Sequence, residues 1–171
     1  MKTLLLFLFS ILISFHSYGE TEYQYFRNGQ IFSEENWIED IAHGKWTRWY
    51  ENGQKKFEGN YKDGNRDGKW TDWFENSQIE SEKNYKDALL SGKSTFWFKN
   101  GQKFIDSNYK DNKPDGKWTF WKMNGQKDEE RNYKDGDLVD ITIFKYSFFS
   151  GHLKSVKKYK DGVCISGDCP D

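Results

Sequence analysis

The sequence lacks net charge, proline and, over most of its length, aliphatic side chains. Its 171 residues carry a formal net charge of -1 at pH 7 and include only two prolines. A net charge this small gives no overall attraction to nucleic acid or to an anionic membrane. So few prolines exclude a collagen-like or proline-rich linker protein. The length is that of a single domain.

Aliphatic residues are scarce once the N-terminal segment is set aside. From Glu20 onward the chain has four Leu, eight Ile and three Val, against 28 aromatic residues. A disordered chain would combine few aromatic residues with a high net charge, and this one has neither. Trp, Tyr and Phe suit the pleated, half-buried surface of a β-sheet. The composition therefore favours a thin all-β structure over a thick packed core.

The N-terminal segment holds the one long apolar run. Lys2 precedes a run that ends at Phe15, and Ser17 and Gly19 are small residues before a cut after Gly19. This order is typical of a secretory signal peptide, and the run is shorter than the ~20 residues that span a bilayer. We therefore expect residues 1–19 to be cleaved and the protein to be exported to the periplasm, the outer surface or the medium. A retained membrane anchor is the alternative.

Cysteine is rare, and both copies lie near the C-terminus, at Cys164 and Cys169. In an exported protein, two cysteines so close together predict one local disulfide. A metal pair and two free thiols are the alternatives. A four-ligand zinc site with these cysteines would need both histidines that remain from Glu20 onward, His43 and His152, and these lie in opposite terminal units. The sequence therefore predicts neither a metal nor a cofactor.

Three short motifs recur at a spacing of 24 residues. Asn-Tyr-Lys-Asp begins at Asn60, Asn84, Asn108 and Asn132. Gly-Lys-Trp-Thr begins at Gly44, Gly68 and Gly116, and Asn-Gly-Gln begins at Asn28, Asn52, Asn100 and Asn124. Self-similarity at a fixed period of this size indicates stacked supersecondary units. We expect four regular units over residues 44–140, degenerate terminal units at 20–43 and 141–163, and a cysteine-containing tail at 164–171.

Each unit has the pattern of a β-hairpin. In the unit that starts at Gly44, two segments rich in β-forming residues flank Asn52-Gly53, a strong signal for a two-residue type I′ turn. The register set by that turn places these residues opposite each other: Trp46 and Gly59, Thr47 and Glu58, Arg48 and Phe57, Trp49 and Lys56, Tyr50 and Lys55.

The predicted fold is all-β. We expect an elongated, twisted antiparallel meander of tandem 24-residue β-hairpins, a single-layer, solenoid-like sheet with about eleven to twelve strands. Aromatic residues fall on both faces of this sheet. One row is expected to join the repeats: Tyr61, Tyr85, Tyr109 and Tyr133. A second row is the candidate aromatic binding face: Trp49, Trp73, Trp97 and Trp121.

The repeat resembles a known family. Gly-Lys-Trp-Thr-x-Trp-Tyr/Phe-Glu-Asn-Gly-Gln-Lys, followed by Asn-Tyr-Lys-Asp-Gly, is similar to the MORN repeat variant over about residues 23–162. Such tandem hairpins are common in bacterial proteins similar to the YwqK-type antitoxins of toxin–antitoxin systems. The resemblance implies a non-enzymatic binding scaffold, and it carries over no catalytic residue.

No catalytic constellation is visible in the sequence. His43 and His152 lie outside the regular units, and carboxylates alternate with lysines in every unit, as is typical of solvated strands and turns. We therefore expect that the protein is not an enzyme.

One local motif matches the start of a calcium loop. The segment from Asp63 to Gly68 has the D-x-N-x-D-G order, which makes Asp63, Asn65 and Asp67 weak candidate ligands. A complete loop has a Glu at its twelfth position, and this chain has Phe74 there. The alternative is an ordinary Gly/Asp turn.

Three hypotheses for the function of the protein remain. The first is an exported scaffold that binds a protein partner through one face of the sheet. The second is a module whose aromatic face binds envelope glycans or choline-like groups. The third is contact with a membrane surface, for which the dense lysines near the C-terminus are the local signal: Lys154, Lys157, Lys158 and Lys160. Nucleic acid is not an expected partner.

Overall fold

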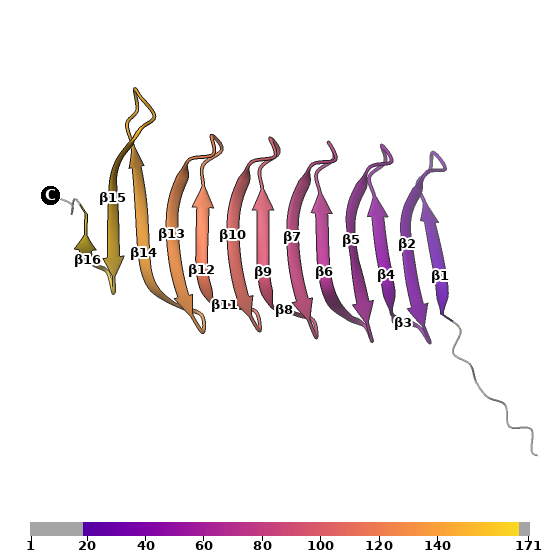
Figure 1. Ribbon diagram of the computed structural model, residues 1–171. Coiled ribbons are helices and arrows are strands. Elements are labelled where there is room, and N and C mark those ends of the chain that lie inside the picture. The colour runs from indigo at the N-terminus through magenta and orange to yellow at the C-terminus, as the bar shows by residue number, and fades with distance from the viewer. Residues whose placement is uncertain (1–18, 168–171) are drawn as a thin grey trace, which may run out of the picture.

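The computed structural model describes residues 19–167, which form one open antiparallel β-sheet whose strands follow one another in chain order (Figure 1). The sheet has 16 strands. They are β1 (Glu20–Tyr25), β2 (Ile31–Ile38), β3 (Ile41–Ala42), β4 (Gly44–Trp49), β5 (Lys55–Lys62), β6 (Asn65–Trp73), β7 (Ile79–Lys86), β8 (Leu89–Leu90), β9 (Gly92–Trp97), β10 (Lys103–Lys110), β11 (Lys113–Pro114), β12 (Gly116–Trp121), β13 (Lys127–Lys134), β14 (Asp137–Tyr146), β15 (Leu153–Lys160) and β16 (Val163–Ser166).

The predicted all-β meander of tandem hairpins is confirmed. The strands outnumber the expected eleven to twelve because β3, β8 and β11 are separate two-residue pieces and because the tail adds β16. In all three places a glycine with positive φ interrupts the strand: Gly44, Gly92 or Gly116 (80°, 86° and 85°). Such a conformation is open to glycine at little cost, and it breaks the regular extension of the strand.

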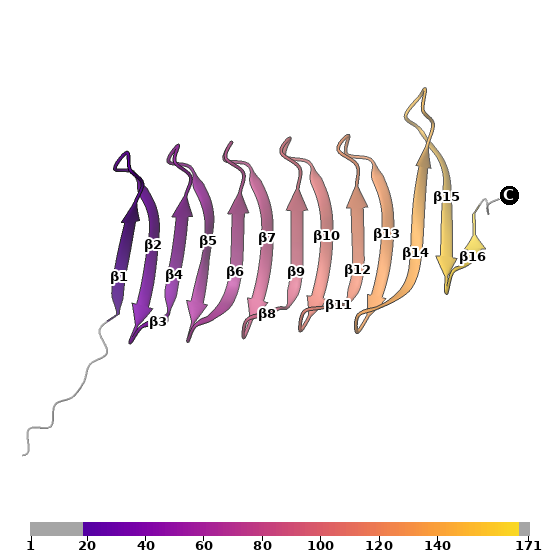
Figure 2. The ribbon, with the colours of Figure 1, turned by 180° about the vertical axis from the view of Figure 1, so that it is seen from behind.

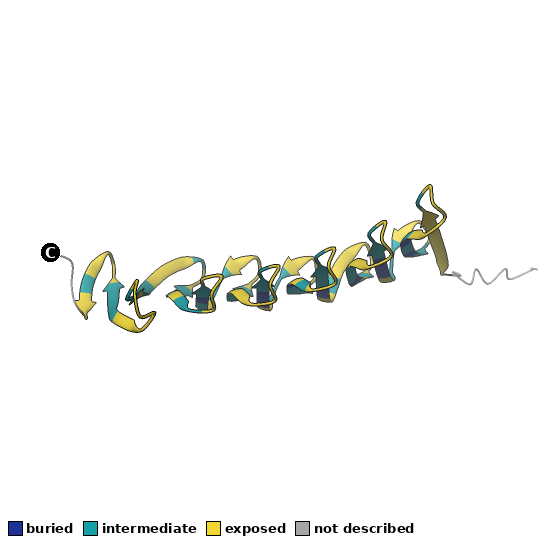
Figure 3. Ribbon diagram, turned by 90° about the horizontal axis from the view of Figure 1, so that it is seen from above, coloured by how far each residue is buried: buried dark blue, intermediate teal, exposed yellow. Residues whose placement is uncertain are grey.

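The sheet is a single layer. Figure 2 shows it from behind and Figure 3 from above, and the hairpins stand in one elongated row with neither face covered by another element. Among the described residues, the only hydrophobic side chains classed as buried are Trp46 and Trp70, at 8% and 3% exposure. The core is therefore a thin line of rings between neighbouring hairpins.

The turns at the hairpin tips differ from the predicted type I′ form. The Tyr50 N–H donates to the Gln54 carbonyl (2.8 Å), and the Gly53 N–H donates to the Tyr50 carbonyl (2.9 Å). Gly53 has φ of 81°, whereas Asn52 is not in the positive-φ region. This pattern is that of a three-residue loop that ends in a left-handed glycine. The prediction of a two-residue turn was wrong because Asn-Gly is common to both loop types.

The extra loop residue changes the register near the tip. The predicted pairs of Trp46 with Gly59, Thr47 with Glu58 and Arg48 with Phe57 are confirmed. A bulge follows Arg48, so that Trp49 lies opposite Lys55. The predicted pairs of Trp49 with Lys56 and Tyr50 with Lys55 were therefore wrong.

The asparagine of each tip turn links one repeat to the next. The Asn52 side-chain oxygen accepts a hydrogen bond from the Gln54 N–H (3.0 Å), and its Nδ2 donates to the Glu75 carbonyl of the next tip (3.1 Å). Asn76 and Asn100 donate in the same way to the carbonyls of Lys99 (3.3 Å) and Met123 (3.0 Å). This ladder explains why asparagine recurs at this position.

The type I′ geometry occurs instead at the base turns, which join successive hairpins. In the first of them within the regular units, Asp63 and Gly64 have φ of 49° and 78° between the paired residues Lys62 and Asn65. Positive φ at both central residues defines this turn. The later base turns have the same form at Asp87-Ala88, Asp111-Asn112 and Asp135-Gly136.

Several predicted features fall outside the described residues. The expected signal peptide lies there except for Gly19, and so does Cys169 of the expected disulfide. Cys164 lies half-buried in β16. Over residues 19–167 the structure contains no helix with the length and apolarity needed to cross a membrane.

Replacing Ala88 by glycine should stabilise the protein. Ala88 has φ of 66°, a conformation that costs an L-residue about 1–2 kcal/mol, more than the added freedom of a glycine in the unfolded chain. We expect Ala88→Gly to raise the free energy of unfolding by about 0.5–1 kcal/mol, measured by urea unfolding. The matched control is Ala42→Gly in β3, which should lower it by a similar amount. Equal losses in both variants would contradict the assignment of strain to Ala88.

Candidate functional site

The alternation of side chains along each strand gives the sheet two distinct faces. Trp46 and Trp49 are three residues apart in the first regular hairpin, so they point to opposite faces. We call the first the stacked face, defined by Trp46, Trp70 and Trp118 with Tyr61, Tyr85, Tyr109 and Tyr133. We call the second the lysine face. It is defined by Trp49, Trp73, Trp97 and Trp121 and by the charged residues that pair between them: Lys45, Lys55, Lys69, Lys93, Lys103, Lys117 and Lys127 with Glu58, Glu82, Asp106 and Glu130.

Aromatic rings on the stacked face pack from one hairpin to the next. The Trp46 ring lies 4.8 Å from Trp37 and 4.7 Å from Tyr61, centroid to centroid. Tyr61 then contacts Trp70 edge-to-face at 5.0 Å, and Trp70 lies 6.2 Å from Tyr85. Such ring pairs contribute about 0.5–1.5 kcal/mol beyond the area they bury. The prediction that the tyrosine row joins the repeats is confirmed for Tyr61 and Tyr109, whereas Tyr85 and Tyr133 contact the tryptophan of their own hairpin.

Each indole of this row is also tied by a hydrogen bond. The Nε1–H of Trp46 donates to the Asn36 carbonyl (2.9 Å), and that of Trp70 donates to the Asn60 carbonyl (3.1 Å). Trp118 donates to the Asn108 carbonyl at 3.0 Å. A buried indole N–H needs such a partner, and the bond fixes the ring against the preceding strand. These tryptophan rings therefore stabilise the sheet through packing and hydrogen bonds between hairpins.

The row is interrupted at Ser94, which stands where the other units have tryptophan. Ser94 is buried, and its carbonyl accepts a hydrogen bond from the Ser107 hydroxyl (2.9 Å). The ring contacts resume at Tyr109 and Trp118, 5.1 Å apart. The hairpin of β9 and β10 therefore joins the preceding hairpin through backbone pairing without a tryptophan of this row, whereas Tyr109 joins it to the following hairpin.

The lysine face carries a row of carboxylates held between lysines. Glu58 lies 2.9 Å from the Lys45 ammonium and 2.5 Å from that of Lys55. The other units repeat the arrangement: Glu82 with Lys69, Asp106 with Lys93 and Lys103, and Glu130 with Lys117 and Lys127. These contacts bring seven lysines together with four carboxylates, so the face has a positive excess on a chain of net charge -1.

The lysines lower the pKa of two carboxylates in this row, Glu58 and Glu130. Burial of the Glu58 carboxylate raises its pKa, but the hydrogen bonds from Lys55 and Lys45 outweigh that effect and hold the pKa below the ordinary 4.5. The pKa of Glu130 is lowered by Lys117 and Lys127 against the same opposing effect of burial. These groups stay ionised well into the acid range.

The tryptophans of the lysine face are half-buried, and lysines lie over some of them. The Lys55 ammonium is 5.6 Å from the Trp73 ring centroid, and that of Lys103 is 5.7 Å from the Trp121 ring. These are cation–π distances. Beside Trp73, a shallow hollow of about 440 Å³ is lined by Lys45, Glu58, Lys69, Thr71 and Glu82, among others. The face thus combines half-buried tryptophan rings with ion-paired charges.

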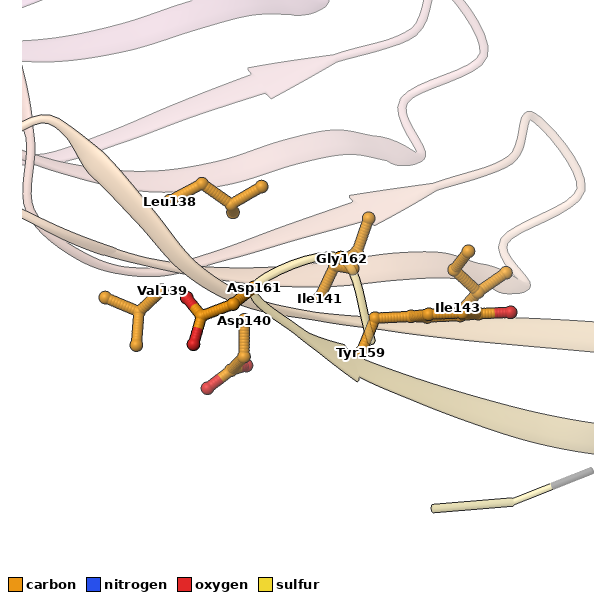
Figure 4. Close-up of a pocket in the computed structure, with 8 residues that line it drawn as sticks. All are labelled: Leu138, Val139, Asp140, Ile141, Ile143, Tyr159, Asp161 and Gly162. Atoms are coloured by element: carbon orange, nitrogen blue, oxygen red, sulfur yellow. The ribbon is translucent and has the colours of Figure 1, made fainter. Parts of the chain in front are cut away.

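A second hollow lies near the C-terminal end of the sheet and is apolar. It has a volume of about 290 Å³ and is lined by Leu138, Ile141, Ile143 and Tyr159 together with the turn after β15 (Figure 4). The sequence analysis did not single it out. Its signal was the set of aliphatic residues in β14, where the preceding unit has aromatic residues in β12.

The remaining sequence candidates are not gathered into one site. Asp63 lies in a base turn with its carboxylate 3.5 Å from the His43 ring, and Asn65 and Asp67 belong to β6. Over residues 19–167 no group of three or more His, Cys, Asp or Glu is placed to hold a metal ion. His152 lies at the far hairpin tip, where its carbonyl accepts from the Ser147 N–H (2.8 Å).

Comparison with known proteins supports the repeat assignment. The family model of the MORN repeat variant matches residues 42–63 and 66–87. In the structure these two segments are the hairpins of β4 with β5 and of β6 with β7. No curated protein matches the chain. The resemblance is therefore confirmed for two adjacent hairpins.

Substituting Gly59 should test the packing of the stacked face. A Cβ at this position would lie 2.2 Å from Cδ2 of Trp70, whose indole is buried and hydrogen-bonded. We expect Gly59→Ala to lower the free energy of unfolding by about 1–3 kcal/mol. In a Trp70→Ala background the same substitution should cost much less, since the obstructing ring is gone. Strict additivity of the two changes in a double-mutant cycle would contradict this packing.

The carboxylate row should make stability depend on acid pH. A carboxylate with a lowered pKa stabilises the folded state above its ordinary pKa, and this stabilisation is lost as the pH falls through the lowered value. The urea midpoint of the wild type should therefore drop as the pH falls below about 4.5. Glu58→Gln/Glu130→Gln should flatten that drop, whereas Glu75→Gln at an exposed tip turn should not. Parallel curves for all three proteins would overturn this assignment.

Proposed function

We propose that this chain is a non-catalytic, exported repeat scaffold that binds a protein partner through its lysine face. The observation that carries the proposal is the unequal use of the two tryptophan rows. Trp46 and Trp70 are buried in contacts between repeats, whereas Trp73 and its equivalents are half-buried among lysines. Partly accessible tryptophan is a side chain that protein interfaces favour.

The charge of the lysine face suggests the chemistry of the partner. Its lysines outnumber its carboxylates, so it complements an acidic surface better than a basic one. The arrangement recurs from hairpin to hairpin, so it suits an extended partner that touches several repeats. The partner proposed is therefore an acidic protein segment laid along the row of hairpins.

A choline-like ligand is less well supported. Quaternary ammonium groups bind over aromatic rings. Over Trp73 and Trp121 that position is already taken by the ammonium groups of Lys55 and Lys103. Such a ligand would have to displace a charge that belongs to the protein.

The match to the MORN repeat variant at residues 42–63 and 66–87 supports the scaffold part of the proposal. Export rests on the signal-like residues 1–19 alone. An antitoxin-like role, in which the protein partner is a toxin, rests on the resemblance to YwqK-type antitoxins. Both are parts of the proposal.

In-cell crosslinking followed by affinity purification of the full chain tests this function. We expect one protein to crosslink to the wild type, and Trp73→Ala/Trp97→Ala to reduce its yield by at least about tenfold. Lys45→Gln/Lys69→Gln, which keeps every ring, should also reduce it. Met123→Ala, which removes an exposed apolar side chain from a tip turn, is the control and should leave the yield unchanged.

Two results would contradict the proposed function. One is an equal yield of the crosslinked protein from the wild type and the Trp73→Ala/Trp97→Ala variant while both remain folded. The other is retention of the wild type on insoluble cell wall and its release by choline or sugar, which would favour the glycan-binding hypothesis.

A further inference from the structure

The tip of the last hairpin exposes two adjacent phenylalanines. Phe148 and Phe149, between β14 and β15, are 95% and 97% exposed. Their rings contact each other edge-to-face at 5.5 Å and otherwise project from the loop. Figure 1 shows that this hairpin reaches beyond the tips of all the others. The two rings are therefore the outermost apolar groups along that edge of the sheet.

The loop that carries these rings is closed by hydrogen bonds. The Ser147 N–H donates to the His152 carbonyl (2.8 Å), and the Gly151 N–H donates to the Ser147 carbonyl (3.0 Å). Side chains this exposed contribute almost nothing to folding through burial, whereas full burial of a Phe contributes about 1.5–3 kcal/mol. The loop thus exposes the apolar surface of two Phe rings, which is available for burial against another surface.

The charge around the tip is of one sign. Residues 141–160 contain five lysines and no Asp or Glu. Lys145 and Lys154 flank the tip directly, and the Lys122 ammonium of the neighbouring hairpin lies 5.6 Å from the Tyr146 ring. The carboxylate at the neighbouring tip, Asp128, is ion-paired with Lys122 at 3.4 Å. The chain is nearly neutral overall, but this corner is basic.

We propose that the tip of the β14–β15 hairpin inserts Phe148 and Phe149 into the headgroup region of an anionic lipid bilayer. Stable attachment to a membrane surface usually needs two signals, an inserted apolar group and a basic patch, and this tip has both. The two rings stand at 88° to each other and offer no common flat face to a complementary protein groove. A fluid bilayer accommodates such a shape.

This attachment leaves the proposed protein-binding surface free. The rings lie at one corner of the sheet edge that carries the tip turns, whereas the lysine face lies along the flat of the sheet. The inference does not depend on the protein partner, because it concerns lipid alone. A scaffold with both properties would hold its partner at a membrane surface.

Co-flotation of the full chain with lipid vesicles tests the inference. The probes are vesicles of phosphatidylcholine alone and vesicles that also contain phosphatidylserine. We expect binding to the anionic vesicles that weakens with added salt. Phe148→Ser/Phe149→Ser should weaken this binding by at least about tenfold. Lys145→Gln/Lys154→Gln should weaken it about fivefold for each lysine.

The matched control is Val163→Ser/Ile165→Ser, which removes two exposed apolar side chains from β16 at the same end of the sheet. It should bind the vesicles as the wild type does. Because all variants keep residues 1–19, any binding through that segment is common to them. Equal binding by the wild type and Phe148→Ser/Phe149→Ser would overturn the inference. So would a wild type that ignores vesicles and instead loses a crosslinked protein when the two phenylalanines are replaced.

Discussion

The contact between a tryptophan of one hairpin and the tyrosine and backbone carbonyl next to it is the interaction on which the sheet depends. A single layer has no second sheet or helix against which to bury apolar surface. Trp46 and Trp70 supply that burial sideways, since each ring lies against Tyr61 and donates its N–H to the strand before it. The stability of such an array is a sum over neighbouring units, so its length can grow without a thicker core.

Because the stacked face supplies the packing between hairpins, the lysine face is available for binding. Glycine at Gly59 leaves room for the Trp70 ring, and Ser107 is the small residue at the equivalent position two repeats further along. Over residues 19–167 the opposite face buries only small side chains such as Thr47 and carries charge in register with half-buried rings. Hydrogen bonds at the two ends of each hairpin, from Asn52 at the tip and Gly64 at the base, keep the units aligned. The side chains of the repeated face are therefore held at a regular spacing.

The 24-residue period was enough to predict the meander of hairpins, and counting outward from Asn52-Gly53 predicted that Trp46 lies opposite Gly59. Local turn chemistry was harder, because Asn-Gly at Asn52 and Asp-Gly at Asp63 are both hairpin signals and only the hydrogen bonds distinguish them. The separation of the two tryptophan rows followed from strand alternation, but which row is buried depends on contacts between repeats. The exposed rings of Phe148 lie in a unit that departs from the repeat, so periodicity carried no information about them.

The ring contacts of the stacked face hold neighbouring hairpins together, and the lysine face does not. The most direct measurement compares the free energy of unfolding of Trp70→Ala with that of Trp73→Ala, three residues away in the same strand. We expect the free energy of unfolding to fall by about 3–5 kcal/mol for Trp70→Ala and by less than half of that for Trp73→Ala. Equal losses, or a larger loss at Trp73, would show that the lysine face carries the cohesion of the sheet and would contradict the account.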